Sequence, residues 1–167
     1  MHQLLLMRHA KAERARPDLP DFDRALAPAG LVAATAMRRK LQSLAVEPDV
    51  VLVSSARRTR ETFEQVLAWD HGATLDLIDT LYMAPLGRLL DLLAGLRETA
   101  RSVLIIGHNP GLGELAWTLA ANGPESPAKA KLNEGFPTMR VAEFLILTAW
   151  RDIRPATSRL QRVIDPE

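Results

Sequence analysis

The chain has 167 residues, of which 47% are apolar and 25% charged; this is typical of a globular protein and argues against disorder. Its 21 basic and 20 acidic side chains leave a net charge of +1, so we expect no nucleic-acid partner, and any anion site must be local. The absence of cysteine excludes disulfides and thiolate chemistry, and the lack of a secretory leader or a membrane-length apolar run predicts a cytoplasmic protein without a membrane partner.

The N-terminal segment predicts a buried strand that ends in two polar side chains. Residues 4–7 are apolar in succession, which is typical of a strand buried on both faces. Arg8 and His9 follow directly, and residues 11–27 are polar and interrupted by prolines, which predicts a loop able to lie over the strand end. Ligands of open α/β sheets bind outside the carboxyl ends of the strands, so Arg8 and His9 are the first candidate site residues.

Strands and helices alternate along the rest of the chain. Pro28 is placed to begin a helix whose apolar positions recur as far as Leu44. We expect further strands at residues 50–53, 75–78, 102–106 and 141–147, and further helices beginning near residues 57, 85 and 112. The strand at 75–78 suits a sheet edge, and residues 123–135 are polar and rich in breakers.

The alternation predicts an α/β fold: a three-layer αβα sandwich with a mostly parallel central sheet. No internal repeat or linker divides the chain, so we expect a single domain over residues 1–167. Parallel strands bring their carboxyl ends to one side of the sheet. The side chains that follow three of the buried strands should therefore converge there.

The converging side chains include two histidines and at least one arginine. His9 follows the first strand, and His108 follows the strand at 102–106. A cluster of arginines at 57, 58 and 60 begins the helix after the second strand, and an arginine fork matches phosphate oxygens. Arg57 and Arg60 are well explained as solvated side chains that pair with Glu61 and Glu64. A phosphate site needs one arginine that points back to the strand end.

Other uses of these residues are less well supported. Two histidines can bind a metal ion, but a metal site needs a third ligand, usually a carboxylate, and tolerates arginines poorly. Residues 107–111 lack the lysine and hydroxyl of a P-loop, and Ser54-Ser55 lacks the glycine pattern of a nucleophile elbow. His2, before the first strand, and His71, in a turn, are each expected to be exposed and without a role.

The strand-end motifs resemble those of the histidine phosphatase superfamily, which has the phosphoglycerate-mutase-like fold. The matching segments are Arg8-His9-Ala10 for its Arg-His-Gly, Ser54, Arg58 and Thr62 for its Ser-x-x-x-Arg-x-x-x-Thr, and Gly107-His108 for its later Gly-His. The spacing registers the family arginine onto Arg58 rather than Arg57. Further strings are similar to the short phosphohistidine phosphatase SixA group: Asp23-Arg24 with Leu26 and Gly30, residues 107–111, Phe136-Pro137-Thr138 and residues 163–166.

The resemblance implies a covalent mechanism without a metal or other cofactor. His9 would attack phosphorus as a neutral imidazole and form a phosphohistidine that water hydrolyses. Arg8, Arg58 and His108 would bind the phosphate oxygens. The implied substrate is phosphohistidine in a protein of the histidine-phosphotransfer type. The alternatives are a small phosphomonoester as substrate, and a binding module that holds phosphate or a phosphoprotein without turnover.

Two positions depart from the superfamily pattern. Ala10 replaces the common glycine, which is a small change. Residues 79–83 contain no glutamate, whereas phosphoglycerate mutases and many ester phosphatases carry a glutamate general acid in this region. Asp79 and Tyr82 are the candidates to replace it, unless no residue does. The missing glutamate is shared with the SixA group and argues against mutase activity.

Overall fold

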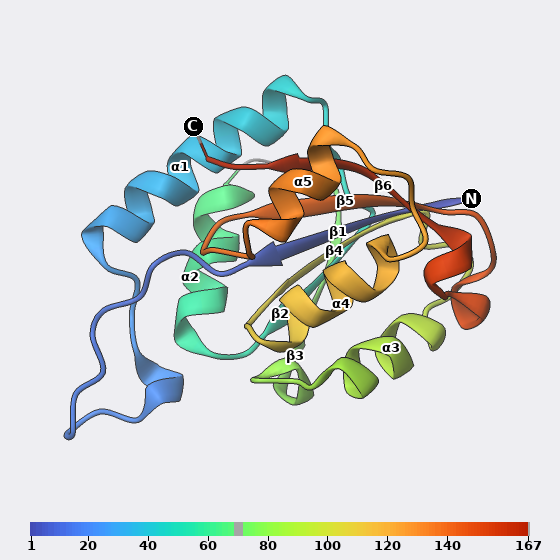
Figure 1. The fold of residues 1–167 in the computed structure, drawn as a ribbon. Helices are drawn as coiled ribbons and strands as arrows, with labels where there is room; N and C mark the ends of the chain where they lie inside the picture. The colour runs from blue at the N-terminus through green and yellow to red at the C-terminus, as the bar shows by residue number, and fades with distance from the viewer. Residues whose placement is uncertain (69–71, 167) are drawn as a thin grey trace.

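A computed structural model describes residues 1–68 and 72–166 (Figure 1). The strands are β1 (His2–Arg8), β2 (Val50–Ser54), β3 (Thr74–Ile78), β4 (Ser102–Gly107), β5 (Val141–Ile146) and β6 (Ser158–Ile164). The α-helices are α1 (Pro28–Ser43), α2 (Arg57–Val66), α3 (Leu86–Ala94), α4 (Gly111–Ala120) and α5 (Pro127–Asn133). Short 3₁₀ helices lie between them: η1 (Asp21–Asp23), η2 (Asp79–Leu81), η3 (Trp150–Asp152) and η4 (Pro155–Thr157).

The strands form one mixed sheet in the order β3-β2-β4-β1-β5-β6. The first four of these are parallel to one another, whereas β5 and β6 are antiparallel to their neighbours. The sheet is therefore mostly parallel, as predicted, and β3 lies at an edge. Among the described helices, none is both long and apolar enough to cross a bilayer.

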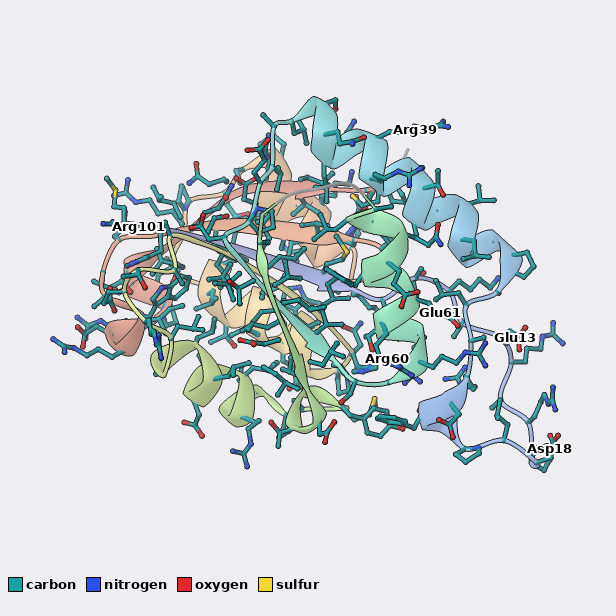
Figure 2. The ribbon with its side chains drawn as sticks, turned by 180° about the vertical axis from the view of Figure 1, so that it is seen from behind. Glu13, Asp18, Arg39, Arg60, Glu61 and Arg101 are labelled. Carbon is teal, nitrogen blue, oxygen red and sulfur yellow. The ribbon has the colours of Figure 1, made fainter. Side chains whose placement is uncertain are left out.

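Helices cover both faces of the sheet. Successive residues of β1 point to opposite faces, and both faces carry apolar side chains that need to be buried. Leu4 and Leu6 pack in the apolar cluster that includes α3, α4 and α5. Leu5 and Met7 pack in the second cluster, with α1 and α2. All four side chains are fully buried. Figure 1 shows α4 and α5 on the near side of the sheet, and Figure 2, the view from behind, shows α1 and α2 on the other side. The αβα layers confirm the predicted fold class.

Two elements lie where the sequence pattern indicated none. Residues 123–135 contain α5, which has Pro127 in its first turn and Ser126 as its N-cap, with the Ser126 hydroxyl oxygen accepting from the backbone N–H of Lys129 at 3.1 Å. Residues 158–164, for which no element is predicted, form β6, which pairs with β5. Both elements are held by tertiary contacts: α5 packs against β6, and β6 extends the sheet by pairing with β5.

The prediction that His2 is exposed is wrong. His2 begins β1, is 4% exposed, and its ring lies 4.7 Å from that of Trp150. Its Nδ1 lies 3.0 Å from the carbonyl oxygen of Thr148, and its Nε2 lies 3.2 Å from a carboxylate oxygen of Glu98. Pairing of β1 with β5 carries the chain end under η3, which nothing in the local sequence indicates. His71 lies outside the described residues.

Residues 11–27 form a loop that projects from the body beside the end of β1 (Figure 1). Two backbone hydrogen bonds of 2.9 Å close its neck: Ala27 N–H to Lys11 O, and Glu13 N–H to Ala25 O. The Glu61 carboxylate of α2 also accepts a 2.7 Å hydrogen bond from the backbone N–H of Leu26. Figure 2 shows Glu13 and Asp18 on this loop, beyond Glu61. The neck is thus fixed to α2, next to the carboxyl ends of the strands.

Candidate active site

The register of the central strands places His9 beside His108. Strands β1 and β4 pair in parallel up to Arg8 opposite Gly107, so the two histidines leave the sheet together. The backbone N–H of His9 donates to the carbonyl of Gly107 at 3.1 Å. The two imidazole rings are 5.2 Å apart between centroids. Their predicted convergence is what the structure shows.

Of the arginines at the start of α2, Arg58 is the one that points back to the strand ends. It is 2% exposed, whereas Arg57 is exposed and pairs with Glu61 at 2.7 Å. Arg60 is also exposed, on the outer side of α2 (Figure 2). The structure therefore brings Arg58 to the histidines and leaves Arg57 and Arg60 in solvent, in agreement with the motif spacing.

Arg58 determines which nitrogen of each histidine carries a proton. Its Nε lies 3.3 Å from Nε2 of His9, and its Nη2 lies 3.3 Å from Nδ1 of His108. Because a guanidinium only donates hydrogen bonds, these two ring nitrogens are acceptors. The ring proton of His9 is then on Nδ1, which donates to the carbonyl of Ala10 at 2.7 Å. That of His108 is on Nε2, which donates to the Ser54 hydroxyl at 2.8 Å.

Both histidines are held in their neutral form. Burial, aided by the charges of Arg58 and Arg8, lowers the pKa of His9 to about 4. Burial, with His9 and Arg58 nearby, lowers the pKa of His108 to about 3. Near neutral pH, Nε2 of His9 therefore offers a lone pair among cationic side chains. A neutral imidazole in this tautomer is the form that a nucleophilic histidine requires.

Arg8 brings a second guanidinium that lacks a full set of partners. Its Nη1 donates to the carbonyl of Phe136 at 3.1 Å, and the amide nitrogen of Asn109 donates to the same carbonyl at 2.8 Å. The Nε of Arg8 is buried without a hydrogen-bond partner. Burial and the charge of Arg58 lower the pKa of Arg8. A buried unpaired N–H beside further positive charge is a candidate ligand for an anion.

The segment that carries Phe136 is anchored by Arg140, whose part the sequence reasoning missed. The buried Arg140 donates to both carboxylate oxygens of Asp165, at 2.8 and 2.7 Å. It also donates to the carbonyls of Lys131 and Gly135, at 2.7 and 2.8 Å. Asp165 lies in the 163–166 string of the C-terminal tail. That string therefore helps to place the carbonyl that binds Arg8.

Thr62 joins the strand end to α2. Its hydroxyl accepts from the backbone N–H of Ala10 at 3.0 Å and donates to the carbonyl of Arg58 at 2.6 Å. Thr62 and Ala10 are both fully buried. The third residue of the Ser-Arg-Thr motif thus fixes the segment after His9 relative to the helix that carries Arg58.

Asp21 is a site residue that the sequence reasoning did not single out. Its carboxylate Oδ2 lies 3.0 Å from Nη2 of Arg58 and 2.6 Å from the hydroxyl of Tyr82. The hydrogen bond from Tyr82, with the charges of Arg24 and Arg58, holds the pKa of Asp21 well below its usual range. The loop has no periodic pattern, so only its folded path shows that Asp21 reaches Arg58.

Tyr82 and Asp79, the candidate proton donors, lie in different surroundings. The Tyr82 ring is edge-on to His108 at 5.4 Å between centroids, and 5.8 Å from Cζ of Arg58. Its hydroxyl donates to Asp21, which raises the pKa of Tyr82. Asp79 is exposed, and its carboxylate accepts a hydrogen bond from the hydroxyl of Ser55. Of the two, Tyr82 is the one that contacts the cluster around Arg58.

Two histidines could also contribute to a metal site, which needs at least a third ligand. Within residues 1–68 and 72–166, no group of three His, Asp or Glu side chains is arranged to hold a metal ion. The side chains that surround His9 and His108 include two arginines, which suit an anion.

Comparison with known proteins identifies relatives along the full chain. No protein-family model matches. An uncharacterised protein of Mycobacterium tuberculosis is 31% identical over 156 residues, which are 92% of this chain and 96% of that protein. A structure from Nakamurella multipartitia assigned as phosphohistidine phosphatase SixA has a TM-score of 0.84 and 32% identity, covering 99% of this chain and 96% of that one.

A second solved structure is the protein histidine phosphatase SixA complexed with tungstate. It has a TM-score of 0.76 and 25% identity, and the match covers 98% of this chain and 97% of that one. These two matches therefore cover nearly all of the chain. The chain therefore belongs to the histidine phosphatase superfamily, with the phosphoglycerate-mutase-like fold, and within it to the SixA group.

Proposed function

We propose that the protein removes the phosphoryl group from phosphohistidine in another protein, with His9 as the nucleophile. The observation that carries the proposal is the 3.3 Å contact between Nε of Arg58, a donor, and Nε2 of His9, which makes Nε2 the unprotonated ring nitrogen. The unpaired Nε of Arg8 supports it as a further phosphate ligand. A SixA relative was solved with tungstate, an oxyanion shaped like phosphate, which also supports an anion site.

The reaction follows from these groups in two steps. Nε2 of His9, once its hydrogen bond from Arg58 is released to the bound phosphoryl group, attacks phosphorus; the bond from phosphorus to the substrate nitrogen breaks, and the departing imidazole takes a proton from solvent. Arg58 and Arg8 bind the equatorial oxygens, most strongly as charge redistributes in the transition state. His108 donates to an oxygen once its Nδ1 has taken up a proton, which the phosphate charge favours. Water then attacks the phosphorus atom, the bond from phosphorus to Nε2 of His9 breaks, and inorganic phosphate and neutral His9 are released.

The leaving group decides between the substrate classes. An alkyl phosphate expels an alkoxide and needs a positioned proton donor, a contribution of typically about 10²–10⁴-fold. Asp21 is held as an anion, the Tyr82 hydroxyl already donates to Asp21, and Asp79 accepts from Ser55. An imidazole, whose conjugate acid has a pKa of about 6.5, leaves with a proton taken from solvent. These contacts therefore favour phosphohistidine over alkyl phosphates.

A small-molecule phosphomonoesterase is the second candidate. It is favoured by one observation, the presence of the Tyr82 hydroxyl at the site. If Tyr82 turned from Asp21 to a bound ester, it could protonate the leaving alkoxide. The Tyr82→Phe variant separates the two candidates, because only the ester reaction would depend on that hydroxyl.

The test compares a phosphorylated histidine-carrier domain, an aryl phosphate and an alkyl phosphate. We expect kcat/KM for the carrier to exceed that for the alkyl phosphate by at least ~10², the size of one missing general acid, with the aryl phosphate between them. Tyr82→Phe and Asp79→Asn should each change the carrier rate little. His9→Ala should abolish an acid-labile, base-stable phosphoenzyme. If the alkyl phosphate and the carrier domain gave similar kcat/KM values, or if Tyr82→Phe or Asp79→Asn caused a large loss of rate, the phosphomonoesterase would be favoured. Phosphate binding without any turnover would favour a binding module.

A further inference from the structure

The guanidinium of Arg58 uses two different edges. The inner edge, Nε and Nη2, meets Nε2 of His9 and Nδ1 of His108, each at 3.3 Å. The outer edge, Nη1 and Nη2, meets a single residue: Nη1 donates to the backbone carbonyl of Asp21 at 2.7 Å, and Nη2 to its carboxylate at 3.0 Å. A guanidinium is planar and rigid, so fixing its outer edge also fixes the direction of the inner one.

We propose that Asp21 is a positioning residue, which acts through Arg58 and aims its inner edge at the phosphoryl group on His9. The inference rests on the proposed function. An arginine side chain has several rotatable bonds, and a misplacement of about 1 Å in such a group can cost ~10²-fold in rate. Burial alone does not set the rotation of the guanidinium, whereas two hydrogen bonds donated to one residue, Asp21, do.

Asp21 is itself held firmly enough to serve this purpose. Its second carboxylate oxygen accepts from Nε and Nη2 of Arg24, at 2.9 and 2.6 Å. Arg24 also donates to the carbonyl of Glu13 at 2.7 Å, in the neck of the loop. From the other side, the hydroxyl of Tyr82 donates to Oδ2 at 2.6 Å. The carboxylate therefore has partners on the loop, on α2 and on the segment after η2.

The same contacts exclude two other roles for Asp21. As a general acid it would have to carry a proton, but its neighbours hold its pKa well below the usual range. As a direct phosphate ligand it would place one negative charge against another, which opposes binding. Its influence on the reaction is therefore expected to pass through Arg58.

The first measurement uses Asp21→Asn, which keeps the size of the side chain but removes its charge and one acceptor oxygen. We expect kcat on the phosphorylated carrier domain to fall ~10- to 10²-fold, below the ~10²–10³-fold cost of removing a transition-state donor outright, with KM changed less than about threefold. Asp18→Asn is the matched control, because Asp18 lies on the same loop and pairs with Arg16 instead. Equal losses in the two variants would overturn the proposal.

The second measurement is a double-mutant cycle with Arg58→Ala. If Asp21 acts through Arg58, Asp21→Asn should cost less than about twofold in the Arg58→Ala background. Full additivity of the two losses would overturn the proposal. Absence of turnover in the unaltered protein would instead overturn the proposed function.

A third readout does not depend on turnover. The Nε–H of Arg58 should give a slowly exchanging signal in ¹⁵N NMR spectra of the resting protein, because it is buried and bonded to His9. In Asp21→Asn this exchange should accelerate more than about tenfold. An unchanged signal would show that Arg58 keeps its orientation without Asp21 and would overturn the proposal.

Discussion

The surroundings of His9 favour its neutral form, and lowering the pH tests this directly. Burial and the charges of Arg58 and Arg8 lower the pKa of His9 to about 4, whereas an ordinary histidine titrates near pH 6.5. Moving the protein from pH 7.5 to pH 5.5 crosses the range in which an ordinary histidine becomes charged. His9 should remain neutral and able to act as a nucleophile throughout.

The size of the effect follows from the two pKa values. At pH 5.5 a group with a pKa of about 4 is ~97% neutral, whereas one with a pKa of about 6.5 is only ~10% neutral. If neutral His9 attacks phosphorus, formation of the phosphoenzyme at saturating carrier should change by less than about twofold between these pH values. An ordinary histidine in the same place would lose about tenfold.

Two assays measure this. NMR titration of protein labelled with ¹³C-histidine gives the pKa directly, and the spectrum of His9→Asn assigns the signal. Rapid-quench labelling with a phosphorylated carrier domain gives the rate at both pH values. A titration midpoint of His9 at pH 6 or above would refute the claim that burial and the two arginines lower its pKa. A tenfold fall in labelling despite a low midpoint would mean that another group controls the attack.

The remaining predictions concern binding and stability. Phosphate or tungstate should raise the melting temperature of the protein, and Arg58→Ala should remove most of this shift; an equal shift in the variant would contradict the site. Activity should survive EDTA, and loss with rescue by zinc or manganese would instead support a metal site. The pKa values of His9 and His108, about 4 and about 3, lie below the ordinary value, so unfolding takes up protons as the pH falls below 6.5. Urea unfolding should show that the unfolding free energy falls by up to ~2.7 kcal/mol per pH unit as the pH is lowered from 6 to 4.5. An unfolding free energy that does not change over this range would contradict the neutral forms of His9 and His108. Arg140→Ala leaves the Asp165 carboxylate with Lys131, at 2.9 Å, as its remaining ion-pair partner and should cost ~2 kcal/mol of unfolding free energy, whereas a change under ~1 would show that the tail is dispensable.

The convergence of the strand-end residues could be predicted because it depends on a rule of parallel sheets. Apolar runs mark the buried strands, and whatever follows them must meet at one side of the sheet. Arg8, His9 and His108 were placed by this rule alone. Arg58 needed the motif spacing as well, since Arg57 lies at nearly the same position in the chain.

Contacts that depend on the path of a loop could not be predicted in the same way. Asp21 reaches Arg58 because the neck of residues 11–27 is bonded to α2, and no local pattern encodes that path. The burial of His2 depends on pairing between chain segments more than 140 residues apart. The function of Asp165 depends equally on a distant partner, Arg140. In each case the deciding contact is tertiary.

The closed neck of the projecting loop has a consequence for how this fold can diversify. Backbone hydrogen bonds between Lys11 and Ala27 and between Glu13 and Ala25 hold the neck together. The ion pair of Arg16 with Asp18 lies further out, at the exposed tip. Insertions at the tip would lengthen the loop without moving its base, because long surface loops cost little in closure entropy. The tip can therefore differ in length and composition while the chemistry at the base of the loop stays unchanged.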